Sequence, residues 1–282
     1  MAREVTLVDA GLGNIASVER ALIQVGAGVR VARHPDDVAK ARTVVFPGQG
    51  AFGAITSNIV DGQMGNALRM VIERGDPFLG ICLGMQLLFD SSDENGGQKG
   101  FGILKGHCKR FPDGMEMAAE DGAQEVTPEA ADAAADTNHA QTVAPAPAPA
   151  AVSPTAVTQP TLPLIGGPAP QNPAPIAAPV VASPPAPPVA PAPAPAKLVR
   201  RLKVPHMGWN SVEPTGDHYY FVHSYYVETP STDDVMWMTT YGGIRFPAAV
   251  RRGNVLGCQF HPEKSQRAGL KFLRAFLLGG WG

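Results

Sequence analysis

One cysteine stands where a covalent nucleophile could lie. Cys82 is set between Gly80 and Gly84, directly after a short apolar run at residues 78–81. A strand, a small-x-nucleophile-x-small turn and a following helix are typical of a nucleophile elbow, and glycines without a Cβ leave room for the sharp turn. The N-terminal end of a helix also favours a thiolate over a thiol. The pattern therefore predicts a nucleophilic thiol, with an inert buried cysteine as the alternative.

A candidate base and its orienting carboxylate lie far along the chain. A nucleophilic thiol needs a base, and the base needs a partner that orients it. His261 follows an apolar run at residues 255–260, and Glu263 is two residues further on. Residues i and i+2 of an extended backbone point to the same side, and the fixed φ of Pro262 helps to hold them there. We expect Glu263 to accept a hydrogen bond from one imidazole nitrogen while the other faces Cys82. The alternative is a strand-end histidine beside a solvated glutamate.

Acyl transfer also needs N–H donors for an oxyanion. One candidate is the backbone N–H of Leu83, directly after the cysteine. A second donor could come from Gly48-Gln49-Gly50, where the glycines let the backbone turn its amides toward the site. The alternative for this loop is a plain tight turn. No Gly-Lys-Ser/Thr follows it, which argues against a phosphate-binding loop.

Alternating strands and helices must position these three loops. Short β-prone runs are followed by helical patterns, a rhythm that implies a largely parallel sheet with right-handed crossovers. After the cysteine, the spacing of Met85, Leu88 and Phe89 predicts an amphipathic helix. We expect an α/β fold with a flavodoxin-like, open sheet flanked by helices, in which ligands bind at the carboxyl ends of the strands. The strand-forming runs lie at residues 4–8, 29–32, 43–46, 78–81 and 255–260.

Composition excludes several classes of function. The 282 residues carry a formal net charge of −2, which gives no electrostatic footprint for nucleic acid or an anionic membrane. No apolar run reaches the roughly 20 residues that span a bilayer, and the N-terminus has no signal-peptide core. We expect a cytoplasmic protein with no nucleic-acid or membrane partner. Cys82, Cys108 and Cys258 lack metal-ligand spacing, so neither a metal nor a cofactor is expected.

One long segment differs from the rest in composition. Nineteen of the 28 prolines lie at residues 113–196, which carry no aromatic residue and whose apolar content is mostly alanine. Such a segment offers little side-chain area to bury against the entropy of ordering it. We expect residues 1–112 and 197–282 to form one domain, and residues 113–196 to be a low-complexity, disordered Pro/Ala-rich insertion.

Four motifs, in this order along the chain, resemble those of the class I (triad) glutamine amidotransferases. In particular, they are similar to the glutaminase subunits of imidazole glycerol phosphate synthase, from histidine biosynthesis. The resemblance covers nearly the whole chain outside the insertion. The motifs are Gly-Ile-Cys-Leu-Gly-Met-Gln-Leu-Leu-Phe at residues 80–89, Val-Pro-His-Met-Gly-Trp-Asn at 204–210, Tyr-Phe-Val-His-Ser-Tyr-Tyr at 220–226 and Gln-Phe-His-Pro-Glu-Lys-Ser at 259–265.

The resemblance implies a glutaminase reaction. Cys82 would attack the side-chain amide of glutamine, release ammonia and form a γ-glutamyl thioester, which water hydrolyses to glutamate. His261 would move the proton, Glu263 would orient His261, and Gly50 and Leu83 would form the oxyanion hole. Four further residues match positions that hold the glutamine: Gln86, Glu94, Ser224 and Tyr225.

The resemblance also implies a partner, a (β/α)8-barrel cyclase subunit in a heterodimer. Ammonia would pass through the barrel to a phosphoribulosyl-formimino ribonucleotide, which gives imidazole glycerol phosphate and an aminoimidazole carboxamide ribonucleotide. Four residues match positions at or near that subunit interface: Asn14, Trp209, Tyr220 and Lys264.

The chain departs from the family pattern at two single positions as well as in the insertion. It has Gln49 where the family usually has an aliphatic residue, and Ala10 where an aromatic residue is common. A stand-alone Cys-His-Glu hydrolase of the same fold is the alternative, but such an enzyme has no use for Met-Gly-Trp-Asn at a docking face. An interaction scaffold built on the proline-rich segment is disfavoured, because no Pro-x-x-Pro stretch with flanking basic residues occurs before Lys197.

Overall fold

The computed structural model describes residues 3–50, 59–118 and 199–280. All of them belong to one unit of contacting residues, and most of the expected insertion lies outside them. Within these three ranges, no helix has the length and apolar character needed to cross a membrane.

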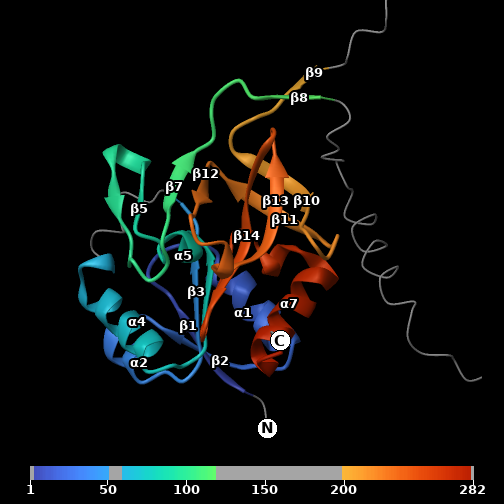
Figure 1. Ribbon diagram of the computed structural model, residues 1–282. Coiled ribbons are helices and arrows are strands. Elements are labelled where there is room, and N and C mark those ends of the chain that lie inside the picture. Colours follow the sequence, from blue (N-terminus) through green and yellow to red (C-terminus); the bar gives the residue numbers. More distant parts are fainter. Residues whose placement is uncertain (1–2, 51–58, 119–198, 281–282) are drawn as a thin grey trace, which may run out of the picture. The chain divides into compact units, whose positions relative to one another are not determined.

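A seven-stranded sheet runs through this unit (Figure 1). Five strands are parallel in the order β2-β1-β3-β4-β15, which is the strand order of flavodoxin-like sheets. Strands β14 and β13 extend the sheet in antiparallel pairing beyond β15. The expected α/β fold class and its largely parallel sheet are therefore confirmed. The strands are β1 Glu4–Val8, β2 Gly28–Ala32, β3 Val44–Gly48, β4 Phe78–Cys82, β13 Val235–Tyr241, β14 Ile244–Arg252 and β15 Val255–Cys258.

Helices cover both faces of the sheet (Figure 1). Helices α1 and α7 pack their apolar residues into one core cluster, and α2 and α4 pack theirs into another. Each of the longer helices has a buried stripe at three- to four-residue spacing, as an amphipathic helix on a sheet must. The bounds are α1 Ile15–Gln24, α2 Pro35–Ala39, α4 Gln63–Glu73 and α7 Gln266–Leu278.

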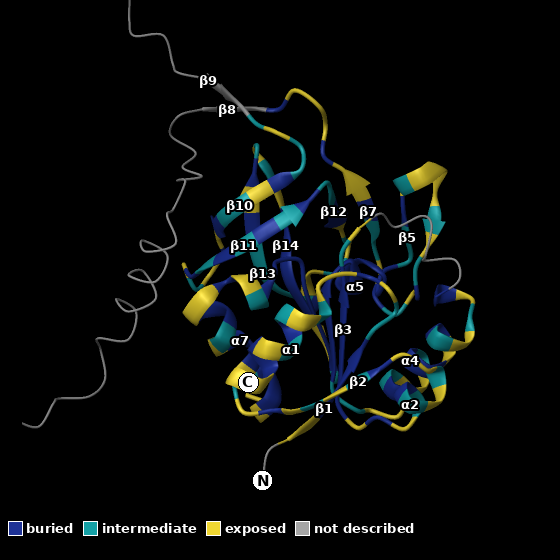
Figure 2. Ribbon diagram, turned by 180° about the vertical axis from the view of Figure 1, so that it is seen from behind, coloured by how far each residue is buried: buried dark blue, intermediate teal, exposed yellow. Residues whose placement is uncertain are grey.

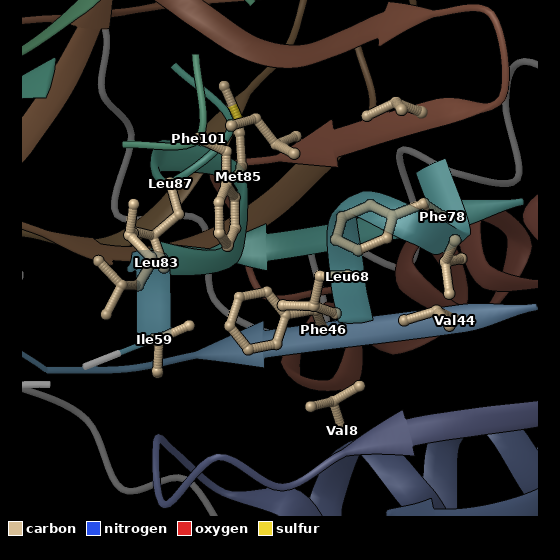
Figure 3. Close-up of a cluster of buried hydrophobic side chains, with 14 of the residues drawn as sticks. Val8, Val44, Phe46, Ile59, Leu68, Phe78, Leu83, Met85, Leu87 and Phe101 are labelled. Carbon is tan, nitrogen blue, oxygen red and sulfur yellow. The ribbon is translucent and has the colours of Figure 1, made fainter. Parts of the chain in front are cut away.

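Strand β3 shows how the pleat separates the two cores. Val44 and Phe46 pack into the cluster with α2 and α4, whereas Val45 packs into the cluster with α1 and α7. Figure 3 shows part of the first cluster, where the ring of Phe78 lies 6.5 Å from that of Phe46 and Leu68 of α4 packs nearby. Every residue of the central strand β4 is buried, and the sheet interior is dark blue in Figure 2. The cysteine therefore sits at the end of a rigid, fully covered strand.

The helix after Cys82 is shorter than expected. Helix α5 spans only Leu83–Gln86, and the chain then turns. The carbonyl groups of residues 87–89 accept hydrogen bonds from N–H groups at residues 101–104 instead of from a next helical turn. All residues from 83 to 89 are buried, and not only those expected on one apolar face, so the expected amphipathic helix is wrong. A single turn carries little macrodipole, which leaves only its first N–H groups near the sulfur.

A second layer of strands lies past the carboxyl end of β4. Strands β10 (His206–Ser211) and β11 (His218–His223) form an antiparallel hairpin. After a break at Ser224, β12 (Tyr225–Glu228) pairs instead with β7 (His107–Arg110). This four-stranded sheet continues through β5 (Ser91–Ser92) and β6 (Gln98–Lys99), which flank a 3-10 turn at Glu94–Gly96.

The chain leaves and re-enters this layer at adjacent points. Strand β8 (Glu116–Ala118) pairs antiparallel with β9 (Val199–Arg201), and Ala118 lies opposite Val199. Strand β8 therefore falls inside the expected insertion. Met115, just before β8, is buried in a third, small core cluster together with Phe111, Tyr226, Tyr241 and Phe246. Because the two ends of the insertion are neighbours, the fold tolerates its length: the entropic cost of closing a loop grows only slowly with the number of residues in it.

Candidate active site

Cys82 lies on a sharp turn between β4 and α5. Its φ of 53° and ψ of −108° are rare for a residue with a side chain, and its side chain is buried. A Cβ on Gly80 would lie 2.5 Å from the carbonyl oxygen of Gly84, and a Cβ on Gly84 would clash with the carbonyl oxygen of Phe46. The turn therefore requires both flanking glycines, as the spacing in the sequence predicts for an elbow.

His261 and Glu263 form a buried pair at the end of β15. Nδ1 of His261 lies 2.9 Å from Oε1 of Glu263, and the two side chains are 1% and 0% exposed. The backbone N–H of His261 donates to Tyr220, and the hydroxyl of Ser265 donates to the carbonyl of His261. A 3-10 turn at Pro262–Lys264, and not an extended strand, brings the carboxylate back to the ring.

The charges around His261 favour its protonated form. Burial opposes the imidazolium, but the thiolate of Cys82 and the carboxylate of Glu263 outweigh burial and raise the pKa of His261 to about 10. Among the described residues, Nε2 of His261 has no hydrogen-bond partner with good geometry. Cys82 is nevertheless close enough to raise the pKa of the ring. The ring therefore keeps one nitrogen tied to a carboxylate and the other uncommitted beside the sulfur.

A chain of two buried amides reaches the sulfur from another direction. Nε2 of Gln259 lies 3.5 Å from Sγ of Cys82, and Gln259 is fully buried. Its Oε1 accepts from Nε2 of Gln86 at 2.9 Å, and the same Nε2 donates to the carbonyl of Tyr225 at 3.0 Å. The sequence contains Gln259 in the motif before His261, but nothing in the motif indicates a contact across 177 positions.

A cavity of about 410 Å³ opens beside Cys82. This volume falls within the roughly 300–1,000 Å³ of small-molecule sites. The cavity brings together all six residues expected to form the oxyanion hole and hold the substrate, whereas His261 and Glu263 do not line it. Its wall contains Gly50, Leu83, Gln86, Glu94, Ser224 and Tyr225, together with Gln49, Pro205, Val222, His223 and Lys264.

Gln49 reaches from the glycine loop to the base. Its side-chain amide lies 3.2 Å from Nδ1 of His261, the nitrogen that also faces Glu263. An Nδ1–H that donates to the carboxylate cannot accept from an amide N–H, so the oxygen of this amide must face the ring. Gly50 beside it has a φ of +116°, which only glycine adopts readily. The aliphatic residue usual in the family could make no such contact.

Three of the four expected interface residues form one row. The ring centroids of Trp209 and Tyr220 are 6.1 Å apart, and Nζ of Lys264 lies 5.7 Å from the centroid of Tyr220. Lys264 also lines the cavity, and Met207 on the same hairpin is 61% exposed. Asn14 instead caps α1, where its side chain accepts from the N–H at position 17.

Two buried histidines lie in contact with each other at the cavity: His223 belongs to its wall, and His206 lies behind His223. His223 donates from Nδ1 to the carbonyl of Tyr225 at 2.8 Å, and its Nε2 lies 3.1 Å from Nδ1 of His206. Burial lowers the pKa of His223 to about 3 and holds that of His206 well below its usual value. Both rings are therefore neutral at physiological pH, which fits a structural role.

The other two cysteines are chemically quiet. Cys108 and Cys258 are fully buried, and burial is the main cause that raises the pKa of each thiol far above its usual value. Neither lines the cavity beside Cys82.

A flavodoxin-like sheet with a cysteine elbow and a buried histidine–glutamate pair at its carboxyl edge is the arrangement that the motifs predict for a class I amidotransferase. The chain matches the family described as glutamine amidotransferase class-I over residues 6–279. It therefore belongs to the class I glutamine amidotransferases, as its motifs predict.

The relatives it resembles narrow the family further. The chain is 32% identical to the imidazole glycerol phosphate synthase subunit HisH of Salinibacter ruber, over 96% of this chain and 92% of the relative. It is 31% identical to that of Moorella thermoacetica, over 97% and 94%. The solved structure of PurLQS from Thermotoga maritima matches with a TM-score of 0.53 at 13% identity over the whole of both chains, which supports the fold alone.

Proposed function

We propose that this chain is the glutaminase subunit of imidazole glycerol phosphate synthase, which releases ammonia from glutamine for a cyclase subunit in histidine biosynthesis. One observation carries the chemistry: the elbow holds Cys82 on the wall of a cavity while His261 and Glu263 lie buried 2.9 Å apart beside it. Relatives whose name states this subunit match nearly the full length of the chain.

The residues support a two-step hydrolysis. The Cys82 thiolate attacks the side-chain carbonyl carbon of glutamine, and protonated His261 gives its proton to the amide nitrogen as the C–N bond breaks. Ammonia leaves, and a γ-glutamyl thioester remains. His261 then accepts a proton from water, which attacks the thioester and releases glutamate and the thiolate. Glu263 holds the ring through Nδ1 in both steps.

The cavity wall offers the groups that this substrate needs. Backbone N–H groups at Gly50 and Leu83 are our candidates for the oxyanion hole, since both residues line the cavity beside the sulfur. The carboxylate of Glu94 suits the ammonium group of glutamine by charge, and Ser224 and Tyr225 offer polar groups close by. Gln86 also lines the cavity, but its amide N–H groups are already bonded, so it can offer the substrate only its oxygen.

A (β/α)8-barrel cyclase is the partner that we propose, in a heterodimer. Trp209, Tyr220 and Lys264 form a row that ends at the cavity, so a partner on this face would stand next to the released ammonia. Asn14 is included on the resemblance alone. A cytoplasmic location stays a prediction of the sequence.

The decisive test is Cys82→Ser in the complete complex. Glutamine-dependent synthesis should be lost, while added ammonium still supports the cyclase. Cys108→Ala is the matched control, because Cys108 is a buried thiol that does not line the cavity and touches its wall at the backbone carbonyl of Gln86, 3.7 Å from Sγ, so glutamine-dependent activity should be kept. Glutamine-dependent activity that persists in Cys82→Ser would show that the nucleophile is misassigned.

The partner can be tested with the unaltered chain. The glycine loop at residues 48–50 can change its peptide orientation easily, so we expect the isolated subunit to be nearly silent until the partner docks. Glutamine turnover is measured with and without the barrel subunit and its ligand. Equal rates would remove this gating and favour a stand-alone hydrolase.

The domain division can be tested by shortening the chain. Ala118 lies opposite Val199, so a two-residue Asn-Gly turn can replace residues 119–198 and close a hairpin. We expect glutaminase activity in the complex to survive. Its loss in a folded variant would indicate a regulatory or scaffolding role for the proposed 113–196 insertion.

A further inference from the structure

The amide of Gln259 is aimed at the reacting sulfur. Gln259 is fully buried after β15, its backbone N–H donates to the carbonyl of Ala248 at 2.8 Å, and its Nε2 lies 3.5 Å from Sγ of Cys82. That separation is ordinary for an N–H donor on a sulfur atom, which is larger than oxygen. The groups that the structure describes in this chain of contacts, two side-chain amides and a backbone carbonyl, are all uncharged.

The direction of both amides is fixed by one backbone carbonyl. The carbonyl of Tyr225 can only accept, so the group of Gln86 that lies 3.0 Å from it must be the NH2. The second hydrogen of that NH2 needs an acceptor, which is Oε1 of Gln259 at 2.9 Å. The NH2 of Gln259 is then left facing Cys82. Flipping either amide would set two donors or two acceptors against each other in a buried site.

The geometry points to Gln259 as a further catalytic residue, an N–H donor that holds and stabilises the Cys82 thiolate, with Gln86 as the positioning residue that orients it. An N–H bond to an anionic sulfur is stronger than one to a neutral thiol or thioester. Gln259 therefore stabilises the attacking state and the leaving thiolate of deacylation. It also leaves Nε2 of His261 free to carry its proton to the departing nitrogen.

This inference rests on the proposed function, because it assigns Cys82 as the nucleophile. The test replaces Gln259 by Met, which has similar length but no donor. The control is Thr239→Val, which removes one buried hydrogen bond, from Thr239 to the carbonyl of Ser211, away from the cavity. The first readout is the rate at which iodoacetamide alkylates Cys82 at pH 7, followed by peptide mapping. The second is glutamine turnover by the complex.

We expect Gln259→Met to slow alkylation about tenfold and to lower kcat for glutamine about 10- to 100-fold, with KM within about threefold. Thr239→Val should lose about as much thermal stability as Gln259→Met but should change neither the alkylation rate nor glutamine turnover. Ammonium-dependent synthesis should be unaffected in both. An alkylation rate equal to that of the unaltered chain would overturn the inference, while an active Cys82→Ser would instead overturn the proposed function.

A second variant decides the matter if Gln259→Met does not fold. Gln86→Met removes the anchor and lets the Gln259 amide rotate, so alkylation of Cys82 should slow about threefold. This readout needs no bound glutamine and is therefore independent of any contact between Gln86 and the substrate. Unchanged alkylation in Gln86→Met would refute the positioning role.

Discussion

Glu263→Gln tests the buried carboxylate with almost no change in shape. Oε1 of Glu263 accepts from Nδ1 of His261 at 2.9 Å, and neither side chain is more than 1% exposed. A hydrogen bond to a buried charge contributes about 1.5–3 kcal/mol, so its loss should lower kcat for glutamine by about 10- to 150-fold. The loss reaches about 10⁴-fold if the new amide donates to Nδ1 and reverses the tautomer, as in other triads.

The pH dependence separates this explanation from general damage. Burial lowers the pKa of His261, and the charges of Cys82 and Glu263 raise it to about 10. Removing one of those charges must lower the pKa, so a reaction that needs the imidazolium should fail at a lower pH in the variant than in the unaltered enzyme. Glutamate release by the complex is measured from pH 6 to 10, with ammonium-dependent synthesis as the control. The assignment of Glu263 would be refuted if the variant turned over glutamine within about threefold of the unaltered enzyme and lost activity at the same alkaline pH.

Three further variants probe the surroundings of the site. Gln49→Val removes the amide 3.2 Å from His261 but leaves its carboxylate partner, so turnover of the complex should stay within about threefold; a larger loss would make the amide essential. His223 has a pKa of about 3 in the fold and about 6.5 when unfolded, so the unfolded chain binds the extra proton and stability falls by up to about 1.4 kcal/mol per pH unit below 6.5. Urea unfolding at pH 7.5 and 5.5 should show this contribution in addition to that of His206, whose pKa burial also lowers, and a slope that is not reduced in His223→Gln would contradict the cause. Gly84→Ala would set a Cβ against the carbonyl of Phe46 and should cost about 3 kcal/mol or prevent folding; an unchanged melting temperature would contradict the crowding.

Local sequence predicted the parts of the site that lie within one motif. Gly80, Cys82 and Gly84 must be small, reactive and small in that order for the elbow to form, and the structure shows the crowding that imposes this order. The largely parallel sheet also follows from the alternation of strand and helix, since a helix that joins two neighbouring parallel strands makes a right-handed crossover. The elbow depends on residues that are neighbours in the sequence, and the sheet depends on the right-handedness shared by all such crossovers, so both can be predicted from a single sequence.

Other features depend on partners far away in the chain. Helix α5 ends early because residues 101–104 take up the carbonyl groups that a longer helix would use, and no local pattern shows that competition. The two neutral histidines owe their contact to the register of β10 and β11, in which His206 lies opposite His223. The histidine–glutamate pair was expected, but from an extended backbone; the short turn that makes the contact shows in the sequence only as Pro262.

The two sides of the Cys82 sulfur differ in kind, and the difference has a chemical reason. On one side stands a cation, since His261 has a pKa of about 10, and on the other side the contact found among the described residues is the neutral amide of Gln259. The nucleophilicity of a thiolate falls as that thiolate becomes more stable, so a second cation would hold the sulfur at the expense of its attack. A neutral N–H donor fixes the direction of the sulfur lone pairs with less stabilisation than a charge would bring. An arginine or lysine at position 259 would therefore be expected to hold the sulfur more strongly than the amide does and to lower its intrinsic nucleophilicity.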